Sequence, residues 1–198
     1  LHLCHHNLET IDTRSMTHKL LAEVCYAAKY EGNSINTHYT IHKETNPGTA
    51  SQLCTVLARS FADIGDIVRG KDLFYGNPQE KDQRKKLDEN LKTIFGKIHK
   101  EVTKGGTNSA LQARYENDTT DFFQLREDWW TINRATIWEA LTCDEENKLA
   151  SASYFRKTCN DYGTSSRAIH KCRCQKNDGK SETDQVPTYL DYVPQYLR

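Results

Sequence analysis

The chain has 198 residues, of which 36 % are hydrophobic and 27 % are charged, with three Trp, ten Tyr and six Phe. This composition is polar for a globular protein but too aromatic for a disordered one, so we expect one folded domain or one to two small subdomains. Lys plus Arg and Asp plus Glu both number 27, giving a formal net charge of zero, so no overall field attracts the chain to nucleic acid or membrane.

The number of cysteines indicates an oxidising compartment, where disulfides offset a modest core. Seven are disulfide candidates: Cys4, Cys25, Cys54, Cys143, Cys159, Cys172 and Cys174. The odd count means that at least one thiol is free, pairs between chains or has its partner outside this sequence, and we favour a fragment of a longer chain. Residues 1–15 lack the pattern of a signal peptide, and no stretch approaches 18 apolar residues, so secretion would be directed from elsewhere.

Apolar residues spaced by three or four predict two helices in the first 70 residues. The first covers residues 15–30 and ends at Glu31-Gly32-Asn33, and residues 33–48 are predicted as a loop that ends at Asn46-Pro47-Gly48. Residues 49–52 match a capping box, and an apolar stripe from Leu53 to Val68 predicts the second helix. Gly65 inside that stripe indicates either close packing against a neighbour or a break in the helix.

Two further helices are predicted before residue 144. Asn77-Pro78-Gln79-Glu80 is a strong helix start, and its apolar stripe runs to Val102, before Gly105-Gly106. Residues 107–120 are predicted as a polar connection. The helix over residues 121–143 has two apolar faces, so we expect burial on two sides and core positions for Trp129 and Trp130. The two faces comprise Phe122, Leu125, Trp129 and Ile132, and Phe123, Trp130, Ile137 and Leu141.

Residues 144–198 have weaker periodicity and hold three of the cysteines, so disulfides are expected to order this region. Its last part, residues 186–198, is proline- and tyrosine-rich and is predicted to be extended. The fold class is therefore mainly α: a disulfide-bonded helical bundle with long loops, with a core in residues 1–143 and a cysteine-rich loop region in residues 144–198.

Catalytic and metal sites are weakly supported. The His170-Lys171-Cys172-Arg173-Cys174 segment, with Cys143 and Cys159 upstream, offers zinc ligands, but one residue between two cysteines is short for a zinc knuckle. Cys4 lies beside His5 and His6, yet no phosphate loop, metalloprotease helix or nucleophile elbow is present. We assign no catalytic residue, no metal and no cofactor; a zinc-stabilised interaction domain remains an alternative.

A local basic segment is the strongest candidate binding site. Residues 69–104 contain ten Lys or Arg against six acidic residues. On the third helix these side chains offer a docking strip for sulfated glycans, although a solvated amphipathic helix would look similar. The candidate glycan-binding residues are Lys81, Arg84, Lys85, Lys92, Lys97, Lys100 and Lys104. Asn117-Asp118-Thr119 is a glycosylation sequon that also suits an ordinary surface loop.

Several longer phrases resemble one protein family. They are Leu1-His2-Leu3-Cys4 with Asn7-Leu8-Glu9, the run from Ala58 to Leu73, the run from Phe123 to Trp130, Lys171-Cys172-Arg173-Cys174, and the run from Val186 to Arg198. Together they resemble the N-terminal, alpha-class Duffy-binding-like domain of Plasmodium falciparum erythrocyte membrane protein 1. The similarity extends over essentially the whole chain.

The resemblance implies a single partial Duffy-binding-like domain over residues 1–198, continued in nature by a further helical section. It implies a non-enzymatic adhesin, exposed on the infected erythrocyte as part of a membrane protein, with a role in rosetting or cytoadherence. The implied partners are host cell-surface receptors, with heparan sulfate, blood-group sugars or complement receptor 1 as candidates, and adjacent domains of the same polypeptide. A structural subdomain that positions a neighbouring receptor-binding domain is the second interpretation.

Overall fold

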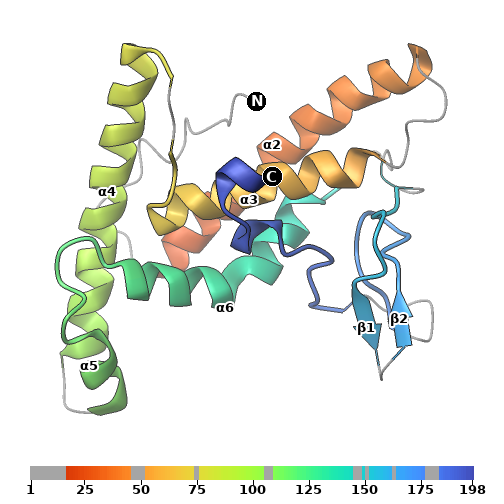
Figure 1. Ribbon diagram of the computed structural model, residues 1–198. Coiled ribbons are helices and arrows are strands. Elements are labelled where there is room, and N and C mark those ends of the chain that lie inside the picture. Colours follow the sequence, from red (N-terminus) through yellow and green to blue (C-terminus); the bar gives the residue numbers. More distant parts are fainter. Residues whose placement is uncertain are drawn as a thin grey trace. The chain divides into compact units, whose positions relative to one another are not determined.

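The protein is mainly helical, as the sequence predicts (Figure 1). The computed structural model describes residues 17–45, 52–73, 76–104, 109–144, 149, 152–161, 164–176 and 183–198. The elements in this part of the chain are α2 (Thr17–Thr45), α3 (Leu53–Arg69), α4 (Pro78–Thr103), α5 (Ser109–Tyr115), α6 (Phe123–Leu141), β1 (Cys159–Asp161), β2 (Thr164–Ser166) and the short 3-10 helices η2 (Leu190–Tyr192) and η3 (Gln195–Leu197).

Contacts divide the described chain into two compact units. The first holds residues from 25 to 64 and from 134 to 198, and the second holds residues from 17 to 24 and from 65 to 133. Helices α2, α3 and α6 therefore contribute residues to both units. The first unit carries the disulfides and the β-hairpin, and the second carries α4 and α5.

Helix α2 is longer than predicted, because the expected exit at Gly32 is wrong. The helix continues to Thr45, so the predicted loop over residues 33–48 is helical over most of its length. Gly32 is buried, and a Cβ atom there would lie 1.9 Å from the carbonyl oxygen of Leu141. Its glycine allows α2 to approach the end of α6, and this packing role cannot be distinguished by sequence from a helix-ending glycine.

Helix α3 confirms the second predicted helix. Its apolar stripe is buried, with Leu57, Phe61 and Val68 fully inaccessible to solvent. Gly65 lies inside the helix without breaking it, and a Cβ atom there would lie 2.8 Å from the Trp130 ring. Close packing against a neighbour is therefore the correct interpretation of this glycine. The predicted capping box lies mostly outside the described residues.

The polar connection predicted over residues 107–120 is partly wrong, because α5 forms within it. Helix α5 lies along the C-terminal part of α4 (Figure 1), where His99 Nε2 contacts the Tyr115 carbonyl oxygen at 2.9 Å and Gln112 donates to the Thr103 carbonyl oxygen. Seven residues are too few for a stable isolated helix, so these tertiary contacts hold it.

Helix α6 is less completely buried than its two apolar faces predict. Trp129 and Trp130 are core residues, as expected, at 5 % and 0 % exposure. Ile132 and Phe123, however, are 78 % and 51 % exposed, so the expectation of burial for these two residues is wrong. Within the first unit, the Trp138 and Phe61 rings pack edge-on with their centroids 5.2 Å apart. Trp138 also donates its indole N–H to the Cys172 carbonyl oxygen.

Disulfides order the region that follows α6. Cys54 pairs with Cys172, and Cys159 at the start of the antiparallel β1–β2 hairpin pairs with Cys174. The final residues are not simply extended, since they form η2 and η3. None of the helices in the described ranges is long and apolar enough to cross a membrane.

Candidate glycan-binding surface on helix α4

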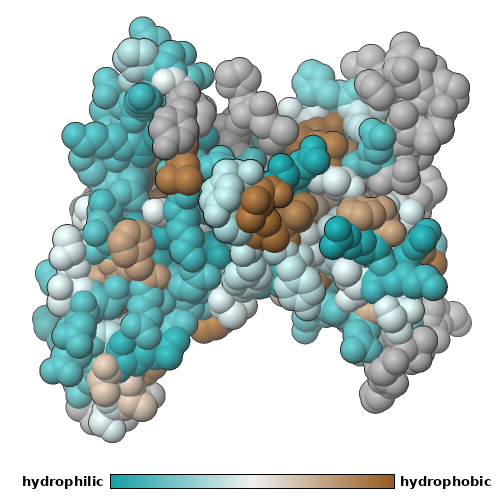
Figure 2. Space-filling view, viewed as in Figure 1, coloured by the Kyte–Doolittle hydropathy of each residue, from teal (hydrophilic) through white to brown (hydrophobic). Residues whose placement is uncertain are grey.

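Helix α4 has a sharply defined start and one buried face. The Asn77 side chain accepts from the Glu80 backbone N–H at 2.9 Å, and Glu80 accepts in return from the Asn77 N–H, which completes a capping box around Pro78. The buried face consists of Leu87, Leu91, Ile94, Phe95 and Ile98. The surface over α4 in Figure 2 is mostly hydrophilic.

A buried arginine fixes α4 against the end of α3. Arg126 is fully buried and donates to the Val68 carbonyl oxygen at 2.6 Å and to the Ile67 carbonyl oxygen at 3.1 Å. The same guanidinium pairs with Asp88 of α4 at 3.0 Å. Burial lowers the pKa of Arg126 from its ordinary value, while Asp88 acts in the opposite direction. One side chain thus joins carbonyls near the end of α3 to α4.

Three of the candidate cations have acidic partners, whereas Lys81 is exposed and forms no ion pair with the described residues. Arg84 pairs with Asp72 at 3.4 Å, and Lys85 approaches Glu89 at 4.0 Å. Lys92 lies 2.8 Å from Asp121 and 2.9 Å from Asp88, and hydrogen bonds to these two carboxylates raise its pKa. Much of the positive charge of Arg84, Lys85 and Lys92 is therefore neutralised within the fold.

The three candidate cations at the C-terminal end of α4 have no such partners. Among the residues that the structure describes, Lys97, Lys100 and Lys104 form no ion pair; Lys100 and Lys104 are exposed and Lys97 is half-exposed. At about 100° per residue, these three lie within a sector of about 60°, and they span about 10 Å along the axis. Lys86, an exposed residue that the predicted set omits, lies in the same sector.

The helix therefore divides the predicted strip. Lys81, Lys85 and Lys92 lie within about 40° of one another and about 100° around the axis from the Lys97 sector. The sequence shows the lysines and their helical phase, but it could not show which of them meet acids from other segments. Asp72 and Asp121, for example, come from loops on either side of α4.

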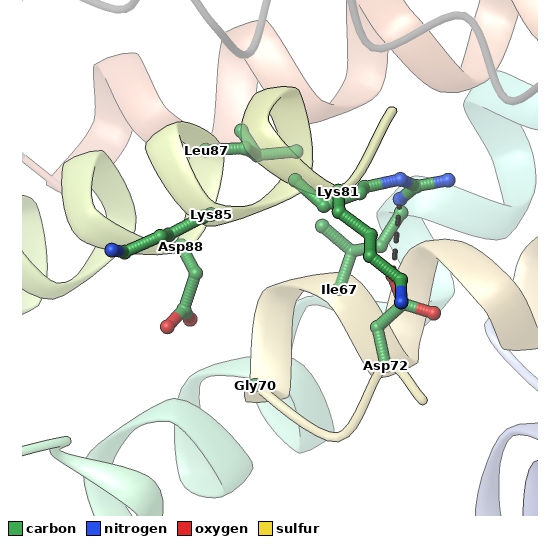
Figure 3. A pocket seen from close by; sticks show the side chains of 8 residues that line it. Ile67, Gly70, Asp72, Lys81, Lys85, Leu87 and Asp88 are labelled. Carbon is green, nitrogen blue, oxygen red and sulfur yellow. Dashed lines mark ion pairs between the residues drawn. The ribbon is translucent and has the colours of Figure 1, made fainter. Parts of the chain in front are cut away.

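A cavity of about 220 Å³ lies beside the first three turns of α4. Its lining includes the cations Lys81, Arg84 and Lys85 and the carboxylates Asp72 and Asp88. In Figure 3 the Lys81 side chain extends toward Asp72, whereas the Lys85 ammonium points away from that group, and the dashed line marks the Arg84–Asp72 ion pair. Because carboxylates line this cavity together with the cations, it is a poorer anion site than the surface formed by Lys97, Lys100 and Lys104.

Four of the six cysteines in the described ranges are disulfide-bonded. Cys54, Cys159, Cys172 and Cys174 form disulfides, so three of the four sulfur atoms considered for zinc are not available. The described residues contain no group of three or more His, Cys, Asp or Glu that could hold a metal. Cys25 and Cys143 are thiols. Burial, with a contribution from Glu139, raises the pKa of Cys25 to about 11, so this thiol is protonated at neutral pH. Cys4 lies outside the described residues.

The sequon residue Asn117 lies in an exposed turn after α5. Its neighbour Asp118 accepts hydrogen bonds from the Gln124 and Leu125 backbone N–H groups at the start of α6. The segment thus serves as a helix cap, and the position of Asn117 is accessible from solvent.

An aromatic cluster around Arg134 is the feature that sequence reasoning missed. The Arg134 guanidinium lies 5.6, 5.7 and 5.3 Å from the rings of Phe61, Tyr189 and Tyr192, which come from α3 and the C-terminal segment. The high tyrosine content of residues 189–196 is the only sequence signal for it, and that signal does not identify the arginine.

The fold is that of a disulfide-bonded, mainly helical domain. A family model described as the Duffy binding domain matches residues 1–198. The chain therefore belongs to the Duffy binding domain family, a family of non-enzymatic binding domains, as the sequence phrases indicate. Comparison with curated protein sequences gave no match.

Solved structures support the same assignment. The chain is 39 % identical to the NTS-DBL1(alpha-1) domain of Plasmodium falciparum membrane protein 1 (PfEMP1) from the varO strain, with a TM-score of 0.72 over 99 % of this chain and 40 % of that one. The NTS-DBL1-alpha and CIDR-gamma double domain of the varO protein gives 39 % identity and a TM-score of 0.72, over 99 % of this chain and 25 % of that one.

A third relative comes from another class of domain. The ICAM-1-binding IT4var13 DBLbeta domain of PfEMP1 is 29 % identical, with a TM-score of 0.64 over 100 % of this chain and 39 % of that one. The chain thus spans about 40 % or less of the length of these three relatives.

Proposed function

We propose that this chain is part of a single Duffy-binding-like domain that acts as a host-receptor adhesin on infected erythrocytes, in rosetting or cytoadherence, and that its ligand is a sulfated glycan such as heparan sulfate. The observation that carries the proposal is the lysine sector of α4, defined as Lys86, Lys97, Lys100 and Lys104. These residues form no ion pair within the described chain and lie on a helix that Arg126 fixes in place. Sulfate groups spaced along a polysaccharide match cations presented at such intervals.

The test is retention on immobilised heparin as a function of salt. The K97E/K100E variant should elute at clearly lower salt than the unchanged chain, because two unpartnered cations become repulsive charges. A matched control is K19E/K157E, which changes the net charge by the same amount at exposed lysines outside α4. Equal retention of all three proteins, or equal losses in both variants, would contradict a glycan site on α4.

The alternative function is a structural one, in which this chain positions a neighbouring receptor-binding domain. The varO double domain supports it, since there the related domain is joined to a CIDR-gamma domain. A receptor and glycan array distinguishes the two functions: blood-group sugars, complement receptor 1, heparan sulfate and ICAM-1 are probed with this chain and with a longer two-domain protein. Binding by the longer protein alone favours the structural role.

A further inference from the structure

The β1–β2 hairpin of the first unit (Figure 1) continues at its base into an outward bulge. Tyr154 donates its backbone N–H to the Ala168 carbonyl oxygen at 2.9 Å, and the next paired residues are Cys159 and Ser166. Residues 155–158 therefore lie opposite a single residue of the other side. Because the longer side does not fit between these two pairings, its surplus residues loop outward.

The bulge is held at its base from two sides. Ser165 donates its hydroxyl to the Lys157 carbonyl oxygen at 2.7 Å, and Gln185 donates its side-chain amide to the Thr158 carbonyl oxygen at 2.9 Å. The residue that follows, Cys159, is buried and disulfide-bonded. These contacts fix the backbone of the bulge, so the side chains that it exposes are presented at a defined place on the surface.

The exposed side chains combine cations with apolar groups. Phe155 and Ile169 are 48 % and 51 % exposed, and the Arg156 guanidinium lies 5.0 Å from the centre of the Phe155 ring. Arg156, Lys157 and Arg167 are exposed and form no ion pair with the described residues. We define these five residues as the hairpin patch.

The segment that contains the patch carries a local excess of positive charge. Residues 152–176 hold six Lys or Arg and one acidic residue, whereas the whole chain has equal numbers of both. Of these cations, Arg173 forms an ion pair with Glu139 of α6. The cations of the patch have no such partner among the described residues, so charge complementarity selects an anionic ligand.

We propose that the hairpin patch binds a membrane surface that carries anionic phospholipids. The headgroups neutralise the cations, while Phe155 and Ile169 reach the apolar boundary beneath the headgroups. Exposed apolar side chains within a charged rim are typical of protein or membrane contact sites. This inference goes beyond the glycan site on α4 and does not depend on it.

The shape of the patch favours a membrane over other anionic ligands. A bilayer accepts an outward bulge, whereas an extended acidic peptide needs a groove or a free strand edge. The outer edge of β1 is already used, since Asn160 donates its backbone N–H to the Gln185 side chain at 2.8 Å. A sulfated glycan uses the cations but leaves Phe155 and Ile169 without a role.

Co-sedimentation with vesicles tests the charged part of the patch. The chain should bind vesicles made of equal parts of phosphatidylserine and phosphatidylcholine, and should bind vesicles of phosphatidylcholine alone much more weakly. R156E/R167E should lower binding to the anionic vesicles by about 25-fold or more, since each cation near an anionic membrane contributes a factor of about five. The matched control is K97E/K100E, which changes the net charge equally on α4 and should lose far less binding.

A tryptophan placed in the patch tests insertion. The three native tryptophans are at most 5 % exposed, so F155W introduces an indole that starts in water. Its fluorescence should shift to shorter wavelength on anionic vesicles and should be quenched by brominated phospholipids. F123W is the matched control, because Phe123 is 51 % exposed and lies outside the patch, and its fluorescence should stay unchanged.

Absence of binding of the folded chain to the anionic vesicles would overturn the inference, as would equal losses in R156E/R167E and K97E/K100E. Vesicle binding that leaves F155W unquenched would show contact through charge alone and would also contradict it. A shift of F155W fluorescence with soluble polyglutamate but not with vesicles would assign the patch to an acidic polypeptide instead. If R156E/R167E does not fold, R156Q/R167Q takes its place, with an expected loss of about 25-fold.

Discussion

Three helical glycines report how closely neighbouring residues approach. A Cβ atom at Gly32 would lie 1.9 Å from a backbone oxygen of Leu141, one at Gly65 would lie 2.8 Å from the Trp130 ring, and one at Gly96 would lie 3.3 Å from the Phe122 ring. Alanine gains about 1 kcal/mol over glycine from helix propensity, whereas overpacking loses about 1–3 kcal/mol or more. The balance between these two effects decides whether alanine raises or lowers the free energy of unfolding at each site.

We therefore expect Gly32→Ala to lower the free energy of unfolding most, Gly65→Ala to lower it less, and Gly96→Ala to change it least. The backbone oxygen near Gly32 cannot move without displacing the end of α6, and the Trp130 ring is fully buried. Gly96→Ala should lie within about 1 kcal/mol of the unchanged protein, because a few tenths of an ångström relieve its contact. Urea titrations followed by circular dichroism measure the series, and a Gly32→Ala protein as stable as the parent would refute the close approach.

At the scale of elements, α5 depends on one carboxylate of α6. Asp128 accepts two hydrogen bonds from Arg114, at 2.6 and 2.7 Å, and a third from the Tyr115 hydroxyl at 2.8 Å. The hydrogen bonds from Arg114 and Tyr115 lower the pKa of Asp128, although partial burial opposes them. A hydrogen bond to a charged group contributes about 1.5–3 kcal/mol, so the bond from the buried Tyr115 is a substantial anchor for α5.

The Asp128→Asn variant should release α5 while the rest of the fold persists. Hydrogen exchange of the amides in Ser109–Tyr115 should become faster, whereas amides in the middle of α4 keep their protection. Because the pKa of Asp128 is lowered in the folded protein, the stabilisation that it provides depends on pH. It is present above the ordinary aspartate pKa of about 3.9 and is lost as the pH falls below that value. Acid should therefore loosen α5 in the parent protein and add little in the variant. Equal protection of α5 in both proteins at neutral pH would contradict this anchor.

The sequence predicts elements best where the signal is local. The Asn77–Glu80 cap and the stripe that follows it are within one helix, so α4 could be placed from sequence alone. Helix α5 and the second half of α2 could not, because tertiary contacts stabilise α5 and a packing glycine in α2 looks like a helix end. The candidate binding residues show the same limit: their helical phase was predictable, but the acids that neutralise Lys92 and Arg84 were not.

At the scale of the whole molecule, two disulfides of very different span constrain the first unit. Cys54–Cys172 joins residues 118 positions apart, and Cys159–Cys174 joins residues 15 apart. The sequence identified these cysteines as candidates but could not pair them, since partners that lie far apart in sequence leave no local pattern. Their spans predict unequal contributions to the free energy of unfolding, because the disulfide that closes the longer loop removes more conformational entropy from the unfolded chain.

Removal of each disulfide by paired alanine substitution should therefore have different effects. The chain-entropy relation gives about 3 kcal/mol for a 15-residue loop and about 4.7 kcal/mol for a 100-residue loop. All four cysteines are buried, so both variants also leave a cavity, and the longer loop should make C54A/C172A lower the free energy of unfolding more than C159A/C174A does. Denaturant titration of the two variants measures the difference, with the parent under oxidising conditions as reference. A larger loss in C159A/C174A would show that the hairpin disulfide, despite its short span, is the principal constraint on this region.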